Sequence, residues 1–178
     1  APEFPHRTIC FHTTHHVGQT YSVEFTYENH MTYVSPKREE VLDGQPVMYL
    51  EEQLPHIRFT PYLREVTAQV VGEEKNPLIK AKKIYDYITS HVMYSFVRTY
   101  ITITQIPDYV ATCWKGDCGF QALLFITMCR IAVVPARRQS GLYTTPDSVG
   151  SHDWAQFYVA PYGWLFADCS FGGSAYRA

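Results

Sequence analysis

The chain has 178 residues, of which 46% are hydrophobic and 18% are charged, and its formal net charge is −2 at pH 7. This length fits one domain, or one domain with a sizeable appendage, and is enough to bury a core. The near-neutral charge excludes the electrostatic signature of a nucleic-acid or anionic-membrane partner. No stretch approaches the roughly 18 consecutive apolar residues of a membrane span. We therefore expect neither partner.

The N-terminal third is predicted to be rich in β-structure. Apolar and polar residues alternate over residues 20–34, which predicts a half-buried strand, and residues 7–17 are its expected partner. Prolines and charged residues over 35–60 predict irregular connections. We expect residues 1–60 to form a β-rich N-terminal appendage and residues 61–178 to form the main domain.

Two helices are predicted next, each with a clear start. Thr60-Pro61 combines a capping residue with a proline in the first turn, and Gly72 is a stop signal. Asn76-Pro77 repeats the start signal, and the apolar residues that follow recur on one helical face. Residues 92–106, rich in Tyr, Thr, Ile and Val, are expected to be extended.

A third helix is predicted over Gly119–Ile131, ended by Pro135. It is apolar almost all round, which indicates a central, buried position. Cys118 lies at its start, where unpaired N–H groups and the macrodipole favour the thiolate. Asp117 is expected to cap the helix, although its charge opposes thiolate formation.

The last predicted element is a hairpin of residues 154–159 and 164–168. Pro161-Tyr162-Gly163 suits a three-residue loop centred on Tyr162. That register would leave His152 four residues beyond the partner of Asp168, or roughly 13 Å of strand. If His152 and Asp168 are to lie directly opposite each other, the hairpin must be centred on residue 160. We therefore expect a longer loop or a shifted register centred near Ala160.

Cys118, His152 and Asp168 follow one another in the chain, 34 and 16 residues apart. A Cys-His pair with a carboxylate behind the histidine is the general arrangement for nucleophilic acyl transfer. Taken alone, Cys118 could be a core cysteine and His152 a surface histidine. Together, they indicate a nucleophile, a general base and an orienting acid. Asp153, next to His152 in a strand, should point to the other face.

These residues belong to fragments that together resemble the core of the transglutaminase-like superfamily. The fragments are Gly116-x-Cys118, Val134-Pro135-Ala136-Arg137, His152-x-Trp154, Gly163-Trp164 and Asp168. The resemblance covers roughly residues 62–172. The sequence departs from the family pattern at Val133, where glycine is common, and at Cys169-Ser170, where a residue and a threonine are usual.

The resemblance implies an α+β, papain-like fold in which a central helix carrying the nucleophile packs on an antiparallel sheet. It also implies that Cys118, His152 and Asp168 form a catalytic triad acting on an amide or peptide bond through an acyl-thioester. Similarity to the compact, bacterial-type members implies hydrolysis, by a protease or amidase, rather than protein cross-linking. The expected partner is a protein or peptide substrate, with no cofactor and no calcium loop.

The oxyanion hole is expected to use the backbone N–H of Cys118 and one further donor. Trp114, Tyr94 and Gln121 are the candidates for that donor. Residues 61–178 would then be the catalytic domain, and we expect it to be truncated at its C-terminus, because the chain stops ten residues after Asp168.

Two other functions are compatible with the sequence. Cys113 and Cys118 have a spacing found in zinc pairs, and His152 or Cys169 could complete a structural zinc site. A catalytically inactive relative that acts as a binding domain is the second alternative. The five cysteines lack the regular spacing of a disulfide scaffold, which favours a reducing compartment such as the cytoplasm.

Overall fold

The computed structural model describes residues 11–14, 16–24 and 33–172. Contacts divide the chain into two compact units, Ala1–Tyr33 and Val34–Ala178. The predicted strands at 7–17 and 20–34 lie about half outside the described residues, and their described residues are not in strands. For the rest they stay predictions, as does the domain boundary at residue 60. All the elements described below belong to the second unit.

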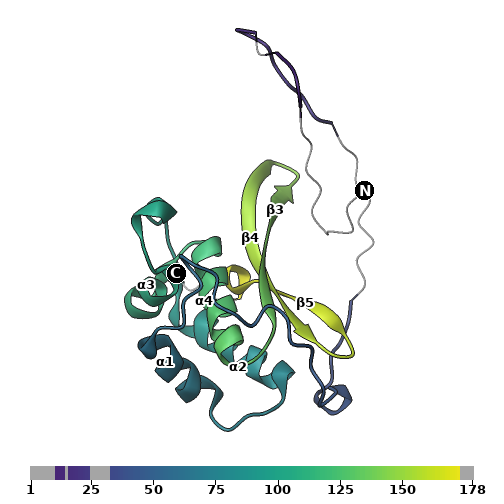
Figure 1. Ribbon diagram of the computed structural model, residues 1–178, viewed down its shortest axis with the longest axis vertical. Coiled ribbons are helices and arrows are strands. Elements are labelled where there is room, and N and C mark those ends of the chain that lie inside the picture. Colours follow the sequence, from purple (N-terminus) through teal and green to yellow (C-terminus); the bar gives the residue numbers. More distant parts are fainter. Residues whose placement is uncertain (1–10, 15, 25–32, 173–178) are drawn as a thin grey trace. The chain divides into compact units, whose positions relative to one another are not determined.

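The second unit is an α+β structure, as predicted. Its helices lie on one side of the three-stranded sheet β3-β4-β5 (Figure 1). The elements are η1 (Arg38–Glu40), α1 (Pro61–Val71), α2 (Pro77–His91), β1 (Met93–Tyr94), η2 (Tyr100–Thr102), α3 (Ile106–Cys113), β2 (Lys115–Gly116), α4 (Cys118–Ile131), β3 (Ala136–Thr145), β4 (Ser148–Val159), β5 (Gly163–Ala167) and η3 (Cys169–Phe171).

Helices α1 and α2 start where their capping residues predict. The Thr60 hydroxyl accepts a hydrogen bond from the backbone N–H of Leu63, and the helix stops at Gly72, which has a φ of 59°. The Asn76 side chain accepts hydrogen bonds from the backbone N–H groups at the start of α2. Each cap satisfies donors that the first helical turn leaves unpaired.

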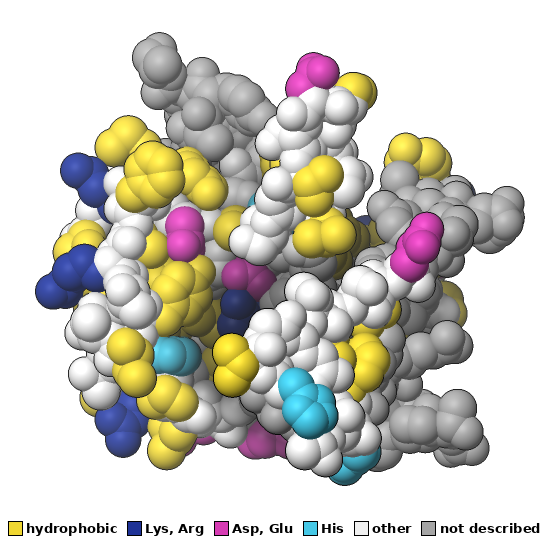
Figure 2. Space-filling model, turned by 90° about the horizontal axis from the view of Figure 1, so that it is seen from above, with side chains coloured by type: hydrophobic (Ala, Val, Ile, Leu, Met, Phe, Trp, Pro, Cys, Tyr) yellow, Lys and Arg dark blue, Asp and Glu magenta, His cyan; other side chains and the backbone are white. Residues whose placement is uncertain are grey.

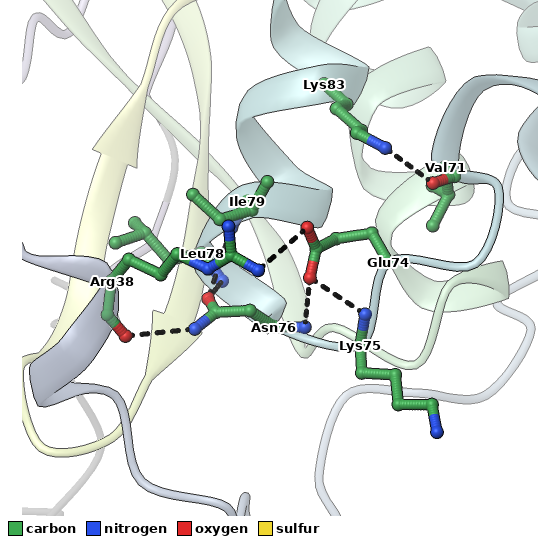
Figure 3. A network of polar contacts seen from close by, with 8 residues as sticks. All are labelled: Arg38, Val71, Glu74, Lys75, Asn76, Leu78, Ile79 and Lys83. Atoms are coloured by element: carbon green, nitrogen blue, oxygen red, sulfur yellow. Dashed lines mark hydrogen bonds and ion pairs between the residues drawn. The ribbon is translucent and has the colours of Figure 1, made fainter.

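A polar network joins the start of α2 to η1 (Figure 3). The Asn76 amide donates to the Arg38 carbonyl at 3.1 Å, and the Arg38 guanidinium lies 3.6 Å from the Glu74 carboxylate. At the C-terminal end of α1, the Lys83 ammonium donates to the Val71 carbonyl at 2.9 Å. The network therefore fixes both ends of the α1–α2 connection.

The region between α2 and α4 differs from the prediction. Extended structure over residues 92–106 is limited to the two residues of β1, which pair in parallel with β2. The sequence pattern did not predict helix α3, because residues 92–106 have the composition of an extended segment that ends at Ile106. The signal for α3 was nevertheless present, since Pro107 is a proline in the first helical turn.

Helix α4 is the central helix that its sequence predicts. Its buried residues include Phe120, Leu124 and Phe125, none of which has exposed surface. The helix packs against β4 and α3. It ends at Ile131, four residues before Pro135, because the chain turns at Val133 with a φ of 61°. This left-handed conformation explains why glycine suits that position better than valine.

The register of the β4–β5 hairpin is centred on residue 161. It is shifted from the turn centred on Tyr162 in the expected direction, and its centre lies one residue from Ala160. Val159 pairs with Gly163, and Ala155 pairs with Ala167. Gly163 has a φ of 82°, the left-handed conformation expected at the end of a three-residue loop. Strand β5 ends at Ala167, and the chain then enters η3.

The molecular surface mixes side chains of all kinds. On the face seen in Figure 2, hydrophobic side chains gather in several groups with basic and acidic side chains between them. Among the described residues, no helix combines the length and the apolar character that crossing a bilayer requires.

Replacing Asn76 with alanine should lower the free energy of unfolding by about 1–2 kcal/mol, because the helix cap and the bond to Arg38 are both lost. Urea unfolding measures this difference. Lys75→Ala, at the neighbouring position, is the control and should stay within about 0.5 kcal/mol of the parent protein. Equal losses in the two variants would contradict the capping role.

Candidate active site

Cys118 is the first residue of α4, and the residues around it lock that helix start in place. The Asp117 carboxylate accepts from the backbone N–H of Phe120 at 2.9 Å, which confirms the predicted cap. The Tyr100 hydroxyl donates to the same carboxylate oxygen at 2.8 Å. A Cβ added to Gly116 would lie 2.9 Å from the Cβ of Phe120, so the chain approaches the helix closely here.

The Cys118 thiol is half-buried between two elements that are far apart in the sequence. The Tyr94 hydroxyl of β1 lies beside the thiol. The backbone N–H of Asp153 in β4 also lies beside the sulfur. Because Asp153 directly follows His152, this contact brings the β4 segment that carries the histidine to the nucleophile.

The environment of Cys118 disfavours its thiolate. Burial raises the pKa of the Cys118 thiol above its usual value, and the charges of Asp117 and Asp153 raise it further. The backbone N–H groups of Asp153 and Gly119 act in the opposite direction but are outweighed. The N–H groups at the helix start do favour the thiolate, as expected, but burial and the two carboxylates have the larger effect on the pKa of Cys118.

Asp153, the neighbour of His152 in β4, lies beside Cys118 because α4 packs on β4. The structure thus brings His152 to Asp168 and Asp153 to Cys118, whereas no hydrogen bond or ion pair joins His152 to Cys118 among the described residues. The Asp153 carboxylate is 2.7 Å from the Arg138 guanidinium and accepts from the Ser140 hydroxyl at 2.5 Å. A Cβ on Gly119 would lie 2.7 Å from the Asp153 carboxylate. A glycine in the first turn of α4 thus allows this acid to approach the nucleophile.

His152 and Asp168 are in direct contact. The His152 Nε2 atom lies 2.6 Å from the Asp168 Oδ2 atom, and both side chains are largely buried. The other carboxylate oxygen of Asp168 accepts from the backbone N–H of Ser170 at 3.0 Å and from its hydroxyl at 2.6 Å. The Tyr85 hydroxyl of α2 donates to the Asp168 carbonyl at 3.2 Å. Because the Nε2 atom of His152 contacts Asp168, Nδ1 is the imidazole nitrogen that can accept a proton from another group.

The hairpin register explains how this contact forms without direct opposition. Continuing the pairing of Ala155 with Ala167 by one residue sets Asp168 level with Trp154. His152 is two residues further along β4 and therefore lies on the same face, as a diagonal neighbour. Diagonal neighbours are about 7–8 Å apart at the backbone, which long side chains can bridge.

Aromatic rings surround the His152 imidazole. Its ring centroid lies 5.2 Å from that of Phe171, 5.9 Å from that of Trp154 and 6.1 Å from that of Tyr143. Two cavities border the histidine, one of about 320 Å³ that also contacts Tyr94 and one of about 870 Å³ that extends to α2. The rings hold the imidazole in place between these cavities.

Of the three candidates for an oxyanion donor, the structure places Tyr94 at the thiol. Gln121 is fully buried, and its amide donates to the Gly116 carbonyl at 3.0 Å. Trp114 packs on the rings of Tyr87 and His91.

Sequence reasoning missed three residues of this site, namely Tyr100, Ser140 and Ser170. Only Ser170 had a local signal, because a serine two residues after an aspartate commonly bonds that side chain.

The four cysteines in the described part of the chain, at positions 113, 118, 129 and 169, are all free. Within the same residues, no group of three or more His, Cys, Asp or Glu side chains could hold a metal ion. In place of metal ligands, Cys118 has Tyr94 and the backbone of Asp153 as neighbours.

Comparisons with known proteins agree with this architecture. Residues 64–169, more than half of the chain, match the transglutaminase-like superfamily. A candidate cysteine protease from Cytophaga hutchinsonii has a similar fold, with a TM-score of 0.60 and 22% sequence identity over 69% of this chain. The periplasmic domain of TgpA from Pseudomonas aeruginosa gives a TM-score of 0.56 and 17% identity over 70% of this chain. No curated protein matches the sequence.

The chain spans less than half of each of these solved structures, 41% of the Cytophaga protein and 46% of the TgpA domain. At this level of identity the likeness concerns the fold. It confirms the predicted α+β, papain-like fold with a helix packed on an antiparallel sheet.

Alkylation of Cys118 by iodoacetamide should follow a pH profile with its midpoint above that of an ordinary thiol, about 8.5, because burial and two carboxylates raise the pKa of Cys118. Asp153→Asn removes one of the negative charges that disfavour the thiolate, so its midpoint should move to lower pH. Mass spectrometry of the peptide that contains Cys118 gives the rate at each pH.

Asp147→Asn, in the exposed turn between β3 and β4, is the matched control and should leave the profile unchanged. The exposed Cys113 provides an internal reference thiol in every sample. An unchanged midpoint in Asp153→Asn would contradict an electrostatic effect of this carboxylate on Cys118.

Proposed function

The chain belongs to the transglutaminase-like superfamily, and from this premise we propose that Cys118, His152 and Asp168 carry out thiol-dependent acyl transfer on an amide or peptide bond. The observation that carries the proposal is the 2.6 Å contact between His152 and Asp168, next to a β4 backbone that touches the Cys118 thiol. A nucleophile, a base and an orienting acid are the parts that this reaction needs.

In the first step, His152 Nδ1 accepts the thiol proton and the Cys118 sulfur attacks the carbonyl carbon. The bond to the amine breaks, the amine leaves with the proton that His152 held, and an acyl-thioester remains. In the second step, His152 takes a proton from water, which attacks the thioester. The carboxylic acid leaves and the proton returns to the thiol.

Asp168 contributes by holding the imidazole in one orientation. Its second oxygen is bound twice by Ser170, so the carboxylate cannot turn away from His152. A carboxylate beside Nε2 also stabilises the imidazolium that forms when Nδ1 takes the thiol proton.

The negative charge on the carbonyl oxygen needs hydrogen-bond donors near the sulfur. The backbone N–H of Cys118 lies in the first turn of α4 and has no partner within the helix. The Tyr94 hydroxyl, which lies beside the thiol in the resting site, is the second donor that we assign. Together they supply the two donors of an oxyanion hole.

Because burial and two carboxylates raise the pKa of the Cys118 thiol, we place the proton transfer to His152 within the reaction. Substrate that fills the site displaces water and brings a carbonyl to the sulfur. Hydrolysis is the outcome that we favour over cross-linking, in keeping with the description of the Cytophaga structure as a candidate cysteine protease.

Mixing the protein with p-nitrophenyl acetate should give a burst of p-nitrophenol and an acetyl group on the peptide that contains Cys118. Cys118→Ser should reduce the acylation rate by at least about 10³-fold. Cys113→Ser, which removes an exposed thiol at the end of α3, is the matched control and should keep the burst. An equal burst in the parent protein and Cys118→Ser would overturn the proposed nucleophile.

The fate of the acyl group separates hydrolysis from amine transfer, because water and an amine compete for the same thioester. With n-butylamine added as a lysine analogue, we expect the free acid to remain the main product, as measured by liquid chromatography and mass spectrometry. The rate of uncatalysed aminolysis, measured with Cys118→Ser, is subtracted. A butylamide as the main enzymatic product would favour cross-linking instead.

A further inference from the structure

The smaller of the two cavities is bordered by Tyr94 and His152 of the proposed site. It has a volume of about 320 Å³, at the lower end of the range for ligand pockets. Tyr94, whose hydroxyl lies beside the Cys118 thiol, forms one wall, and His152 forms another. The remaining walls include Tyr143 and Phe171, and Gly150 keeps one side free of a side chain.

Tyr143 and Phe171 form an aromatic surface in the wall of this cavity. Their rings are stacked, with centroids 5.6 Å apart and an angle of 27° between the planes. Phe171 also presents its ring edge-on to His152, at 5.2 Å. Both aromatic side chains are more than two-fifths exposed, at 43% and 45%, so their ring faces are accessible.

The described walls of this cavity carry no Lys, Arg, Asp or Glu side chain, and His152 is their one imidazole. The nearest acids have partners of their own, since Asp168 is bound by His152 and Ser170, and Asp153 is bound by Arg138. A lysine or glutamate side chain that entered here would lose its hydration without gaining an opposite charge. An aromatic or large aliphatic side chain would instead bury apolar surface against the rings.

We propose that this cavity is a subsite for an aromatic or large aliphatic side chain of the substrate residue that supplies the scissile carbonyl. The proposal rests on the proposed function, because it takes Cys118 as the nucleophile. The acyl residue is assigned to the cavity because it is the part of the substrate attached to the sulfur between the two steps. Its side chain can therefore reach the space beside Tyr94 throughout the reaction.

The larger cavity, of about 870 Å³, provides an internal control. It shares Tyr143, His152 and Phe171 with the subsite but extends away from Tyr94 toward Leu78 of α2. Phe166 of β5 borders only the larger cavity and is 63% exposed. Shortening Phe166 therefore changes the larger cavity while leaving the walls of the subsite in place.

The test uses p-nitrophenyl esters of N-acetylated phenylalanine, leucine, alanine and lysine, with p-nitrophenyl acetate as the reference that lacks a side chain. We expect kcat/KM for the phenylalanine and leucine esters to exceed that for the alanine ester by at least about tenfold. The lysine ester should show no such gain. Phe171→Ala should reduce the phenylalanine-to-alanine ratio to near one, whereas Phe166→Ala should preserve it.

Because the readout is a ratio of two kcat/KM values, a general loss of activity in one variant does not affect it. If Phe171→Ala fails to fold, Tyr143→Ala takes its place in the test. Equal kcat/KM for all four amino-acid esters, with normal acylation by p-nitrophenyl acetate, would overturn the subsite while the proposed function stands. A phenylalanine-to-alanine ratio that falls only in Phe166→Ala would also overturn the subsite. Failure of p-nitrophenyl acetate to acylate Cys118 would overturn the proposed function and the subsite with it.

Discussion

The contact between the His152 imidazole and the Asp168 carboxylate is the interaction on which the arrangement of this site depends. It links β4 to the start of η3, and Tyr85 extends the link to α2 through the Asp168 carbonyl. Three elements from different parts of the chain are therefore held at one point. The contact is also mostly shielded from water, with 13% of the His152 side chain and 7% of the Asp168 side chain exposed, so solvent screens it little.

A second constraint comes from the small ladder of β1 and β2. The backbone N–H of Met93 donates to the Trp114 carbonyl, and that of Ser95 donates to the Gly116 carbonyl. Tyr94 lies between these two bonds, so its position is set by the segment that leads directly into Cys118. Gln121 donates to the same Gly116 carbonyl from inside α4. The proposed oxyanion donor and the proposed nucleophile are thus fixed to one short stretch of backbone.

Local signals in the sequence were sufficient for the starts of α1, α2 and α4 and for the order of the three proposed catalytic residues. The caps at Thr60, Asn76 and Asp117 depend on bonds within a few residues, which a sequence displays directly. The hairpin register was not predictable in the same way, because loops centred on neighbouring residues suit the same turn sequence. The raised pKa of the Cys118 thiol could not be predicted from the sequence either. It depends partly on Asp153, which only the tertiary fold brings to α4.

The raised pKa of the Cys118 thiol has a consequence for its oxidation. Peroxides react with thiolates far faster than with thiols, and the first product is a sulfenic acid. Burial and the charges of Asp117 and Asp153, which raise this pKa, lower the share of thiolate in the empty site. The same carboxylates that oppose ionisation of the sulfur therefore also slow its reaction with peroxides.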